Sequence, residues 1–255
     1  MNLNDLDLQG KRALVRVDFN VPLDDAQHIT DDTRIRRAVP TIQALLDGRA
    51  SVVLMSHLGR PKGPSAELSL KHVVGRLSEL LGRPVKFAED CVGDKALDVT
   101  QGLEPGEVAL LENLRFHAAE KKNDPEFAAK LAAHGDVYVN DAFGTAHRAH
   151  ASMVGVPEAM QDRHRVAGRL LEAELAFLAE AIDDAASPFV AVLGGAKVSD
   201  KLGAIRNLLP RVDAVVIGGG MAYTFLSVLG VSIGRSLFEE DMVVEARGVL
   251  EEAKS

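Results

Sequence analysis

Short apolar runs alternate with segments of helical periodicity along the chain, and this alternation limits the possible folds more than any other feature. The runs at 12–17, 51–55, 85–87, 108–111 and 136–139 predict strands. Between the first two, Ile35, Val39, Ile42 and Leu46 recur at helical spacing, and Gly48 ends the pattern. Strands that alternate with helices indicate a parallel sheet with helices on both faces, a Rossmann-like three-layer α/β sandwich.

The same pattern continues in a second, shorter block. Leu171 to Ile182 predicts a long helix, 189–193 and 214–217 predict strands, and 198–209, 221–229 and 239–254 predict helices. We expect a first domain over 1–168, an interdomain helix and hinge over 169–187, and an incomplete second α/β lobe over 188–255. Two strands alone are marginally stable, so the second lobe is expected to leave apolar surface uncovered.

Composition excludes several classes of protein. The chain has 29 Lys and Arg against 37 Asp and Glu, a net charge of −8, which disfavours nucleic acid as a partner. Cys91 is the single cysteine, so a disulfide framework and a cysteine-based zinc site are excluded. No apolar run reaches the length of a membrane span, and the polar, acidic N-terminus is unlike a signal peptide. We expect a cytoplasmic protein with no membrane partner.

Polar segments follow four of the predicted strands. They are DFN (18–20), SHLGRP (56–61), ENLRFH (112–117) and NDAFGTAHRAH (140–150). The carboxyl ends of parallel strands share one edge of a sheet, and ligands bind beyond that edge. The four segments are therefore expected to meet at one site.

Three of these segments carry an arginine, and a fourth arginine lies near the start of the first helix. The four are Arg60, Arg115, Arg148 and Arg34. A guanidinium group is always charged, and its fork of donors matches carboxylate and phosphate oxygens. Together with His57 and Asn20 they predict a pocket for a small anion. The alternative is that each arginine is a solvated loop residue.

Glycine-rich turns follow both strands of the second block. LGGAKVSDK (193–201) and IGGGMAYTFL (217–226) place glycines between a strand and a helix, where backbone amides can approach a phosphate. Lys197 is expected near a helix N-terminus, with Lys201 one turn later on the same face. Neither segment is a Walker A loop or a GxGxxG fingerprint. Tight packing of helix on sheet explains the glycines equally well.

Histidines at 147 and 150, with His57 and Asp141, raise the alternative of a metal site. The sequence has no HExxH pattern or tight ligand cluster, so no metal-binding residue is predicted.

Six motifs, in the same order, resemble phosphoglycerate kinases. They are VRVDFNVPL (15–23), SHLGRP, LLENLRFH (110–117), NDAFGTAHRAHAS (140–152), LGGAKVSDK and IGGGMAYTFL. The resemblance runs from about residue 6 to the end of the chain. Two departures stand out. The chain stops inside the second lobe, before the family's ribose-binding acidic residue, its late glycine-rich loop with a metal-binding Asp and its returning C-terminal segment. Arg169 stands where the family usually has an apolar or aromatic residue.

The resemblance implies a function for each motif. The first lobe would bind 3-phosphoglycerate through Asp18, Phe19, Asn20, Arg34, His57, Leu58, Gly59, Arg60, Arg115 and Arg148. Gly194, Gly195, Lys197, Lys201 and Gly219 would serve the nucleotide. The implied reaction of glycolysis is reversible transfer of a phosphoryl group between 1,3-bisphosphoglycerate and ADP, with Mg²⁺, in a monomer. Arg34 and Lys197 would act on the transferring group.

Two other functions remain open at this point. In the first alternative, the chain is a fragment that binds 3-phosphoglycerate without turnover, because half of the nucleotide lobe is missing. A dinucleotide-dependent oxidoreductase is the weaker alternative, since GxGxxG is absent.

Overall fold

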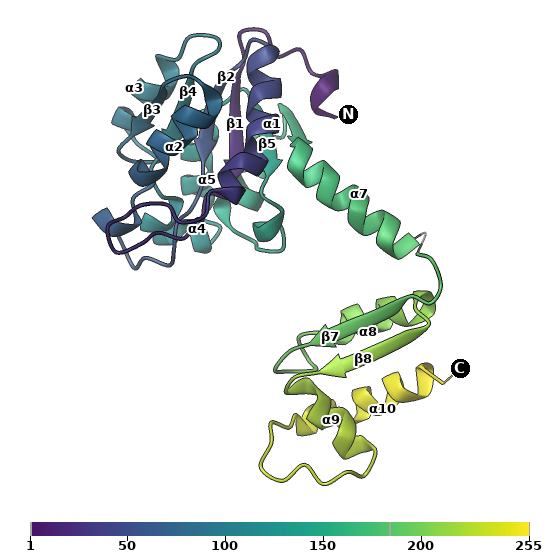
Figure 1. Cartoon of the computed structure of the whole chain (residues 1–255). Coiled ribbons are helices and arrows are strands. Elements are labelled where there is room, and N and C mark those ends of the chain that lie inside the picture. The colour runs from purple at the N-terminus through teal and green to yellow at the C-terminus, as the bar shows by residue number, and fades with distance from the viewer. Residues whose placement is uncertain (1, 184, 255) are drawn as a thin grey trace. The chain divides into compact units, whose positions relative to one another are not determined.

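The computed structural model describes residues 2–183 and 185–254 of the chain. It divides into two compact units, Met1–Leu175 and Ala176–Ser255, which are described separately below (Figure 1). The boundary falls within helix α7 (Arg169–Asp183), inside the stretch 169–187 that the sequence assigns to the connection. The hinge itself stays a prediction.

A six-stranded parallel sheet forms the centre of the first unit. Its strands lie in the order β3-β4-β2-β1-β5-β6, and every neighbouring pair is parallel. Their bounds are β1 Arg12–Val17, β2 Ser51–Met55, β3 Val85–Ala88, β4 Val108–Leu111, β5 Val137–Asp141 and β6 His164–Ala167. The predicted α/β class is confirmed. The sequence predicts the first five strands and misses β6.

Seven α-helices accompany this sheet within the described residues. They are α1 Thr33–Asp47, α2 Lys71–Leu81, α3 Asp94–Gln101, α4 Ala118–Lys121, α5 Pro125–Ala132, α6 Val156–Ala159 and α7. Their ends follow local chemistry. Gly82 closes α2 in the left-handed conformation, at φ 64°. Asp124 precedes Pro125 and accepts a hydrogen bond from the Phe127 amide at 2.9 Å, which caps α5.

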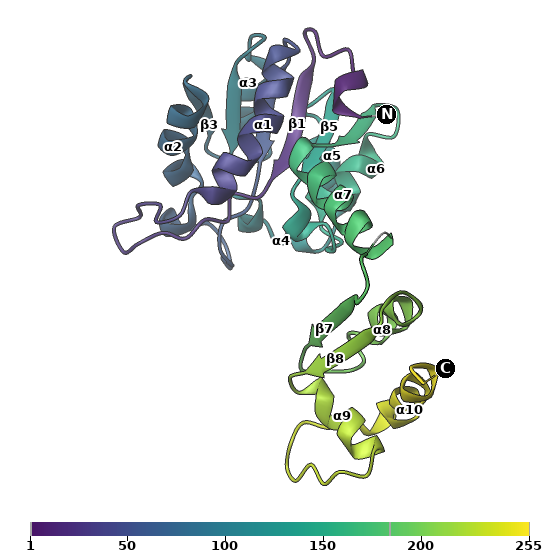
Figure 2. The same cartoon turned by 45° about the vertical axis from the view of Figure 1, so that its right-hand side comes forward.

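Both faces of the sheet are buried, which explains why its strands are continuous apolar runs. Side chains alternate between the faces along β1. Ala13, Val15 and Val17 pack in a core with residues of α1 and α2, whereas Leu14 belongs to a second core with residues of α3, α5 and α6. Figure 2 labels β1 and these helices. The sheet is therefore the middle layer of three.

The strand order creates a crevice at the carboxyl ends of β1 and β5. From β1 the chain passes through α1 to β2 on one side, and from β5 it passes to β6 on the other. Neighbouring strands whose connections leave in opposite directions define the switch point where α/β sheets bind ligands. Residues of the segments after β1 and β5 line the same cavity.

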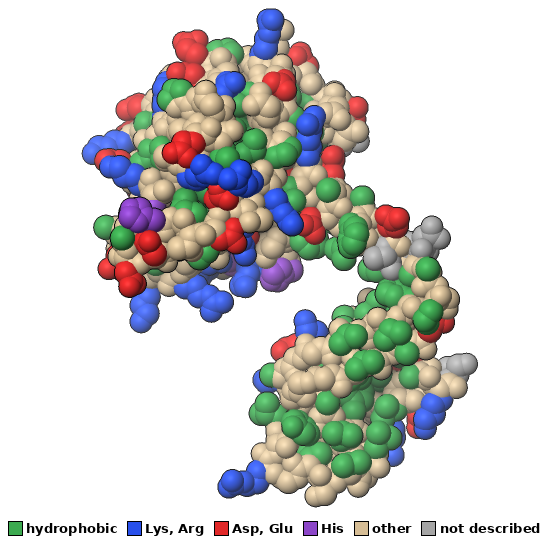
Figure 3. All heavy atoms as spheres, in the orientation of Figure 1, with side chains coloured by type: hydrophobic (Ala, Val, Ile, Leu, Met, Phe, Trp, Pro, Cys, Tyr) green, Lys and Arg blue, Asp and Glu red, His purple; other side chains and the backbone are tan. Residues whose placement is uncertain are grey.

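The second unit has, within its described part, a two-stranded parallel sheet and three α-helices in addition to the end of α7. The elements are β7 Val190–Gly194, β8 Ala214–Gly218, α8 Leu202–Leu208, α9 Met221–Val228 and α10 Val243–Glu252. Its core includes Ile205, Phe225 and Val249. Val192 and Val216 pair across the sheet yet are 75% and 51% exposed, so one face of the sheet is uncovered. Figure 3 shows hydrophobic side chains gathered on the visible face of this unit.

Among the described residues, no helix combines the length and apolarity needed to cross a bilayer.

Candidate functional site

A cavity of about 540 Å³ lies at the carboxyl ends of the strands of the first unit. It is lined by Asp18, Asn20, Arg34, His57, Gly59, Arg60, Arg115, Lys121, Gly144, Thr145, Arg148 and His150. All four arginines singled out from the sequence therefore meet at one site, as do four other residues of the same prediction. Phe19 and Leu58 do not line it, because their side chains are buried in the core at 0% and 2% exposure.

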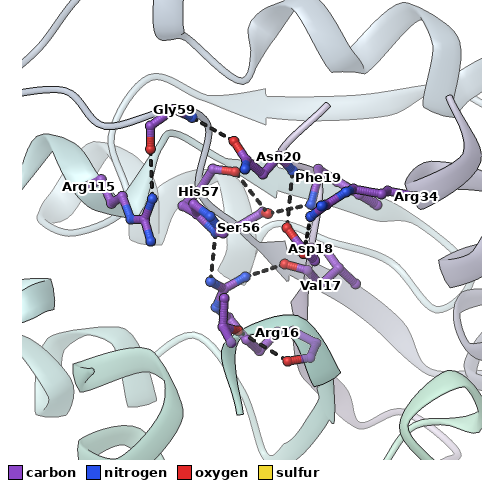
Figure 4. A network of polar contacts seen from close by, with 12 residues as sticks. Arg16, Val17, Asp18, Phe19, Asn20, Arg34, Ser56, His57, Gly59 and Arg115 are labelled. Atoms are coloured by element: carbon purple, nitrogen blue, oxygen red, sulfur yellow. Dashed lines mark hydrogen bonds and ion pairs between the residues drawn. The ribbon is translucent and has the colours of Figure 1, made fainter. Parts of the chain in front are cut away.

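The segment that follows β1 is tied to neighbouring segments by side-chain hydrogen bonds (Figure 4). The Arg34 guanidinium donates to the Asp18 carboxylate and forms an ion pair with it. The Asn20 side-chain oxygen accepts a hydrogen bond from the Gly59 amide at 2.8 Å. These contacts hold the loops after β1 and β2 together and place Arg34 at the cavity.

Arg115 is held at the cavity with part of its hydrogen-bonding capacity unused. Its Nη1 donates to the Gly59 carbonyl at 2.7 Å. Its Nε is buried and has no hydrogen-bond partner. Burial lowers the pKa of Arg115, and the nearby charges of Arg16 and Arg148 lower it further. A partly buried guanidinium with an unpaired Nε and cationic neighbours is a site that an anion would stabilise.

His57 lies in the same cavity as an uncharged imidazole. Burial lowers the pKa of His57 to about 2, and the charges of Arg16 and Arg115 act in the same direction. Its Nδ1 lies 3.0 Å from Nη2 of Arg16. The ring therefore contributes hydrogen bonding and no charge to the site at neutral pH.

Several site residues escape the sequence reasoning. Lys121 reaches the cavity from the end of α4, and Thr145 and His150 reach it from the segment after β5. The sequence predicts that segment 140–150 belongs to the site, but of its residues it assigns only Arg148 to substrate binding. Arg16 is 1% exposed beneath the cavity, where it contacts His57. It lies within the apolar run 12–17, whose pattern gives no sign of a polar function.

The described residues contain one group of three side chains able to share a metal ion, namely Asp90, Cys91 and His117. His117 Nε2 lies 2.7 Å from an oxygen of Asp90, so these two side chains already satisfy each other. Burial raises the pKa of the Cys91 thiol well above its usual value. The alternative metal site at His147 and His150 does not appear within the described part of the chain.

The glycine-rich turns of the second unit pack against each other. A Cβ at Gly219, where φ is +72°, would lie 2.7 Å from the Gly195 carbonyl oxygen. Packing therefore requires this glycine. A Cβ at Gly194 would meet nothing within 4 Å, and one at Gly195 would make only ordinary contacts. Open space at Gly194 is compatible with close approach of a phosphate, whereas the space beside Gly195 is bordered by Met221 and Lys201.

The expected placement of the two lysines is wrong in one respect. Helix α8 begins at Leu202, so Lys197 lies in the preceding turn and Lys201 occupies the N-cap position without a side-chain capping bond. The reason is a carboxylate from later in the chain. Glu239 accepts hydrogen bonds from the Val198 and Ser199 amides and from the Ser199 hydroxyl. These bonds hold the segment as a turn, where the sequence predicts a helix from 198.

Arg169 is the first residue of α7 and is exposed. Its amide donates to the Thr41 hydroxyl at 2.9 Å. Its side chain, the departure noted from the sequence, lies 3.5 Å from the Asn4 side-chain oxygen. Within the first unit Arg169 therefore lies at the surface and outside the core.

Comparison with known proteins identifies relatives for the whole length of the chain. The family model described as phosphoglycerate kinase matches residues 3–255. "Phosphoglycerate kinase, cytosolic" of Triticum aestivum is 54% identical over 99% of this chain and 63% of its own length. "Phosphoglycerate kinase" of Moorella thermoacetica is 56% identical over 98% of this chain and 63% of its own length.

A solved structure has the same fold. Phosphoglycerate kinase from Coxiella burnetii superposes with a TM-score of 0.81 at 40% identity, over 100% of this chain and 63% of that one. The chain thus spans about 63% of the length of these relatives. By family model, sequence identity and fold, the chain belongs to the phosphoglycerate kinase family.

Proposed function

We propose that the cavity of the first unit binds 3-phosphoglycerate and its acyl phosphate, 1,3-bisphosphoglycerate, for the reversible transfer of a phosphoryl group to ADP. The observation that carries the proposal is the convergence of four arginines and Lys121 on a cavity of about 540 Å³ in a chain of net charge −8. An acidic protein that gathers cations in one concave site concentrates its field on a small anion. Asp18, Asn20 and the neutral His57 supply directional contacts for hydroxyl and carboxylate groups.

The chemistry requires alignment and neutralisation of charge and does not require a general base. A carboxylate nucleophile is ionised at neutral pH, so it attacks phosphorus without losing a proton. The barrier lies in bringing two anions together in line. Arg34, exposed on one side and paired with Asp18 on the other, is the residue we assign to the transferring group. Its charge offsets the negative charge shared between the two reactants.

On the nucleotide side we assign Gly194, Gly195, Lys197, Lys201 and Gly219 to ADP and ATP. The open space at Gly194, the glycine backbone at Gly195 and the two ammonium groups fit phosphate oxygens. Mg²⁺, when bound with the nucleotide, would neutralise phosphate charge. The assigned residues offer amides and ammonium groups, which are donors to phosphate and not ligands for Mg²⁺. We therefore assign no metal ligand in this chain.

Two further properties belong to the proposal. We expect a monomer, located in the cytoplasm, with small molecules as its only partners. Transfer needs the two sites to meet and water to be excluded, so we expect motion about a hinge within 169–187.

The second candidate is a chain that binds 3-phosphoglycerate and does not turn over. The exposed face at Val192 and Val216 favours it, because a nucleotide lobe with an uncovered two-stranded sheet is marginally stable. The substrate cavity does not share this weakness, since all of its lining residues belong to the first unit.

Calorimetry with 3-phosphoglycerate, followed by a coupled assay for ATP formation, tests both candidates on this chain. Saturable binding with one site supports the proposed cavity, and ATP formation from 1,3-bisphosphoglycerate and MgADP adds turnover. Binding without ATP formation selects the second candidate. Absence of saturable binding in the wild-type chain, or unchanged affinity in Arg115→Met, would overturn the assignment of the cavity.

A further inference from the structure

A fully buried cluster of polar side chains lies beneath the cavity. Arg16, on β1, is 1% exposed and donates three hydrogen bonds. Its Nε donates to the Ser152 hydroxyl at 3.0 Å, its Nη1 donates to the Val17 carbonyl, and its Nη2 lies 3.0 Å from Nδ1 of His57. A charged group this deep must be held by partners that compensate for the water it has lost.

The compensating charge comes from Glu120, which is also 1% exposed. The Ser152 hydroxyl donates to Oε1 of Glu120 at 2.6 Å, and the Ser152 amide donates to Oε2 at 2.9 Å. Tyr138 adds a hydrogen bond from its hydroxyl to the Ser152 carbonyl at 2.9 Å. Strand β1, helix α4 and the π-helical turn Ala151–Gly155 thus fix the Arg16 guanidinium in one position.

The contact between Arg16 and His57 admits one proton arrangement. A guanidinium has donors only and keeps its charge in proteins. The ring nitrogen 3.0 Å from it must therefore accept, so Nδ1 of His57 carries no proton. A neutral imidazole has its proton on one nitrogen, which leaves it on Nε2. In an imidazolium Nδ1 would also carry a proton. Its N–H would then face the Arg16 N–H, and two donors form no hydrogen bond with each other.

We propose that Arg16 is a positioning residue, which locks His57 as the neutral Nε2–H tautomer so that the ring offers a single N–H donor to an anion in the cavity. The identity of that anion rests on the function proposed above; the tautomer does not.

The charged groups around His57 act in the same direction. Arg16 and Arg115 are the strongest, with Arg34 and His150 also opposing a charge on the ring. Glu120, the acidic group of the cluster, is engaged by Ser152. Protonation would therefore add a cation to a group of cations. His57 therefore favours ligands that place an acceptor atom in line with its Nε2–H. The arginines supply the electrostatic attraction for an anion.

Nitrogen-15 NMR of the ligand-free chain tests the assignment directly. We expect long-range ¹H–¹⁵N spectra to show an unprotonated Nδ1 and a protonated Nε2 for His57, unchanged between about pH 5 and pH 8. The signals are assigned by their loss in His57→Gln. A scalar coupling between the Arg16 Nη2 and His57 Nδ1 nitrogens, seen in the wild-type chain, would establish the hydrogen bond. A proton on Nδ1, or an imidazolium at neutral pH, would overturn the proposal.

A paired variant tests the dependence on Arg16. Arg16→Met with Glu120→Gln removes both buried charges together, so neither is left uncompensated. We expect His57 then to exchange between the Nδ1–H and Nε2–H tautomers, while its pKa stays low because burial, the largest cause of the shift, is unchanged. Arg12→Met is the matched control, because Arg12 lies on the same strand but pairs with Asp136 outside the cavity. His57 signals that are the same in the folded paired variant as in the wild type would contradict the role of Arg16.

The two proposals fail separately. If 3-phosphoglycerate does not bind but the His57 spectra are as expected, the proposed function falls and the role of Arg16 stands. If 3-phosphoglycerate binds and His57 is found as the Nδ1–H tautomer, the reverse holds.

Discussion

Arg34, in the first turn of α1, forms an ion pair with Asp18, the residue that follows β1. One half of the Arg34 side chain remains exposed, while Asp18 is largely covered. The pair therefore orients a cation toward the cavity without neutralising the site, because Arg60, Arg115 and Arg148 have like charge there. Arg34 is the residue on which the proposed chemistry depends most.

Arg34→Ala is expected to weaken 3-phosphoglycerate binding by about tenfold, since a charge-assisted hydrogen bond contributes roughly 1.5–3 kcal/mol and this one is half exposed. In a form of the protein that turns over, the same change is expected to lower kcat by roughly 10³-fold or more. Calorimetry and steady-state kinetics measure the two effects. Arg36→Ala is the control, because Arg36 lies two residues away and pairs with Asp32. Equal effects of the two variants would contradict the role of Arg34.

The buried, neutral His57 predicts how stability changes with pH. Its pKa is about 2 in the folded chain against 6.5 in the unfolded chain, so the unfolded state binds more protons between those values. Stability is therefore lost as the pH falls below about 6.5. Between pH 7 and pH 5 we expect the first unit to lose about 2 kcal/mol from this residue. Guanidinium titrations followed by the amide signals of β1 measure the loss.

His57→Gln should flatten this dependence. A residual slope is expected from His134, whose pKa burial lowers to about 4. If His57→Gln leaves the stability difference between pH 7 and pH 5 unchanged, His57 is not the buried neutral group described here.

Two glycines provide a matched test of packing. A Cβ at Gly135 would lie 2.6 Å from the Cβ of Leu14 and 3.0 Å from its amide nitrogen, so Gly135→Ala forces β1 to move. We expect it to destabilise the first unit by about 1–3 kcal/mol. Gly75, within α2, has nothing within 4 Å of the corresponding position. Gly75→Ala should stabilise by about 0.5–1 kcal/mol. Thermal denaturation distinguishes the two, and a shift of the same sign in both would be inconsistent with the packing described.

Cys91 is expected to resist modification in the folded chain. Its side chain is fully buried, and burial raises its pKa, so thiolate is scarce and inaccessible. Mass spectrometry after iodoacetamide treatment should find it unmodified in buffer and alkylated in guanidinium. Rapid alkylation in buffer would show that the core against α3 and α5 opens.

Much of this arrangement is predictable because local patterns and topology agree. Apolar runs of four to six residues and helical periodicity give the central strands and α1. Motifs that follow parallel strands must meet at one edge, which is why Arg60, Arg115 and Arg148 converge although they are far apart in sequence. The sequence therefore predicts which segments of the chain lie next to one another at the site.

The features that sequence does not predict depend on long-range contacts. Strand β6 carries exposed His164 and Arg165 at the sheet edge, so it lacks an apolar run. The start of α8 is set by Glu239, which is distant in sequence. Arg16 occupies an inward position of a buried strand, where Glu120, acting through Ser152, the Val17 carbonyl and His57 compensate its charge and donors. None of these has a signal within a single element.

A crystal structure of the chain with bound 3-phosphoglycerate is the most direct test of the central claim. The account predicts the phosphate group in contact with Arg60, Arg115 and Arg148, and the carboxylate near Arg34. Density for the ligand outside this cavity, or a phosphate with no guanidinium contact, would contradict it.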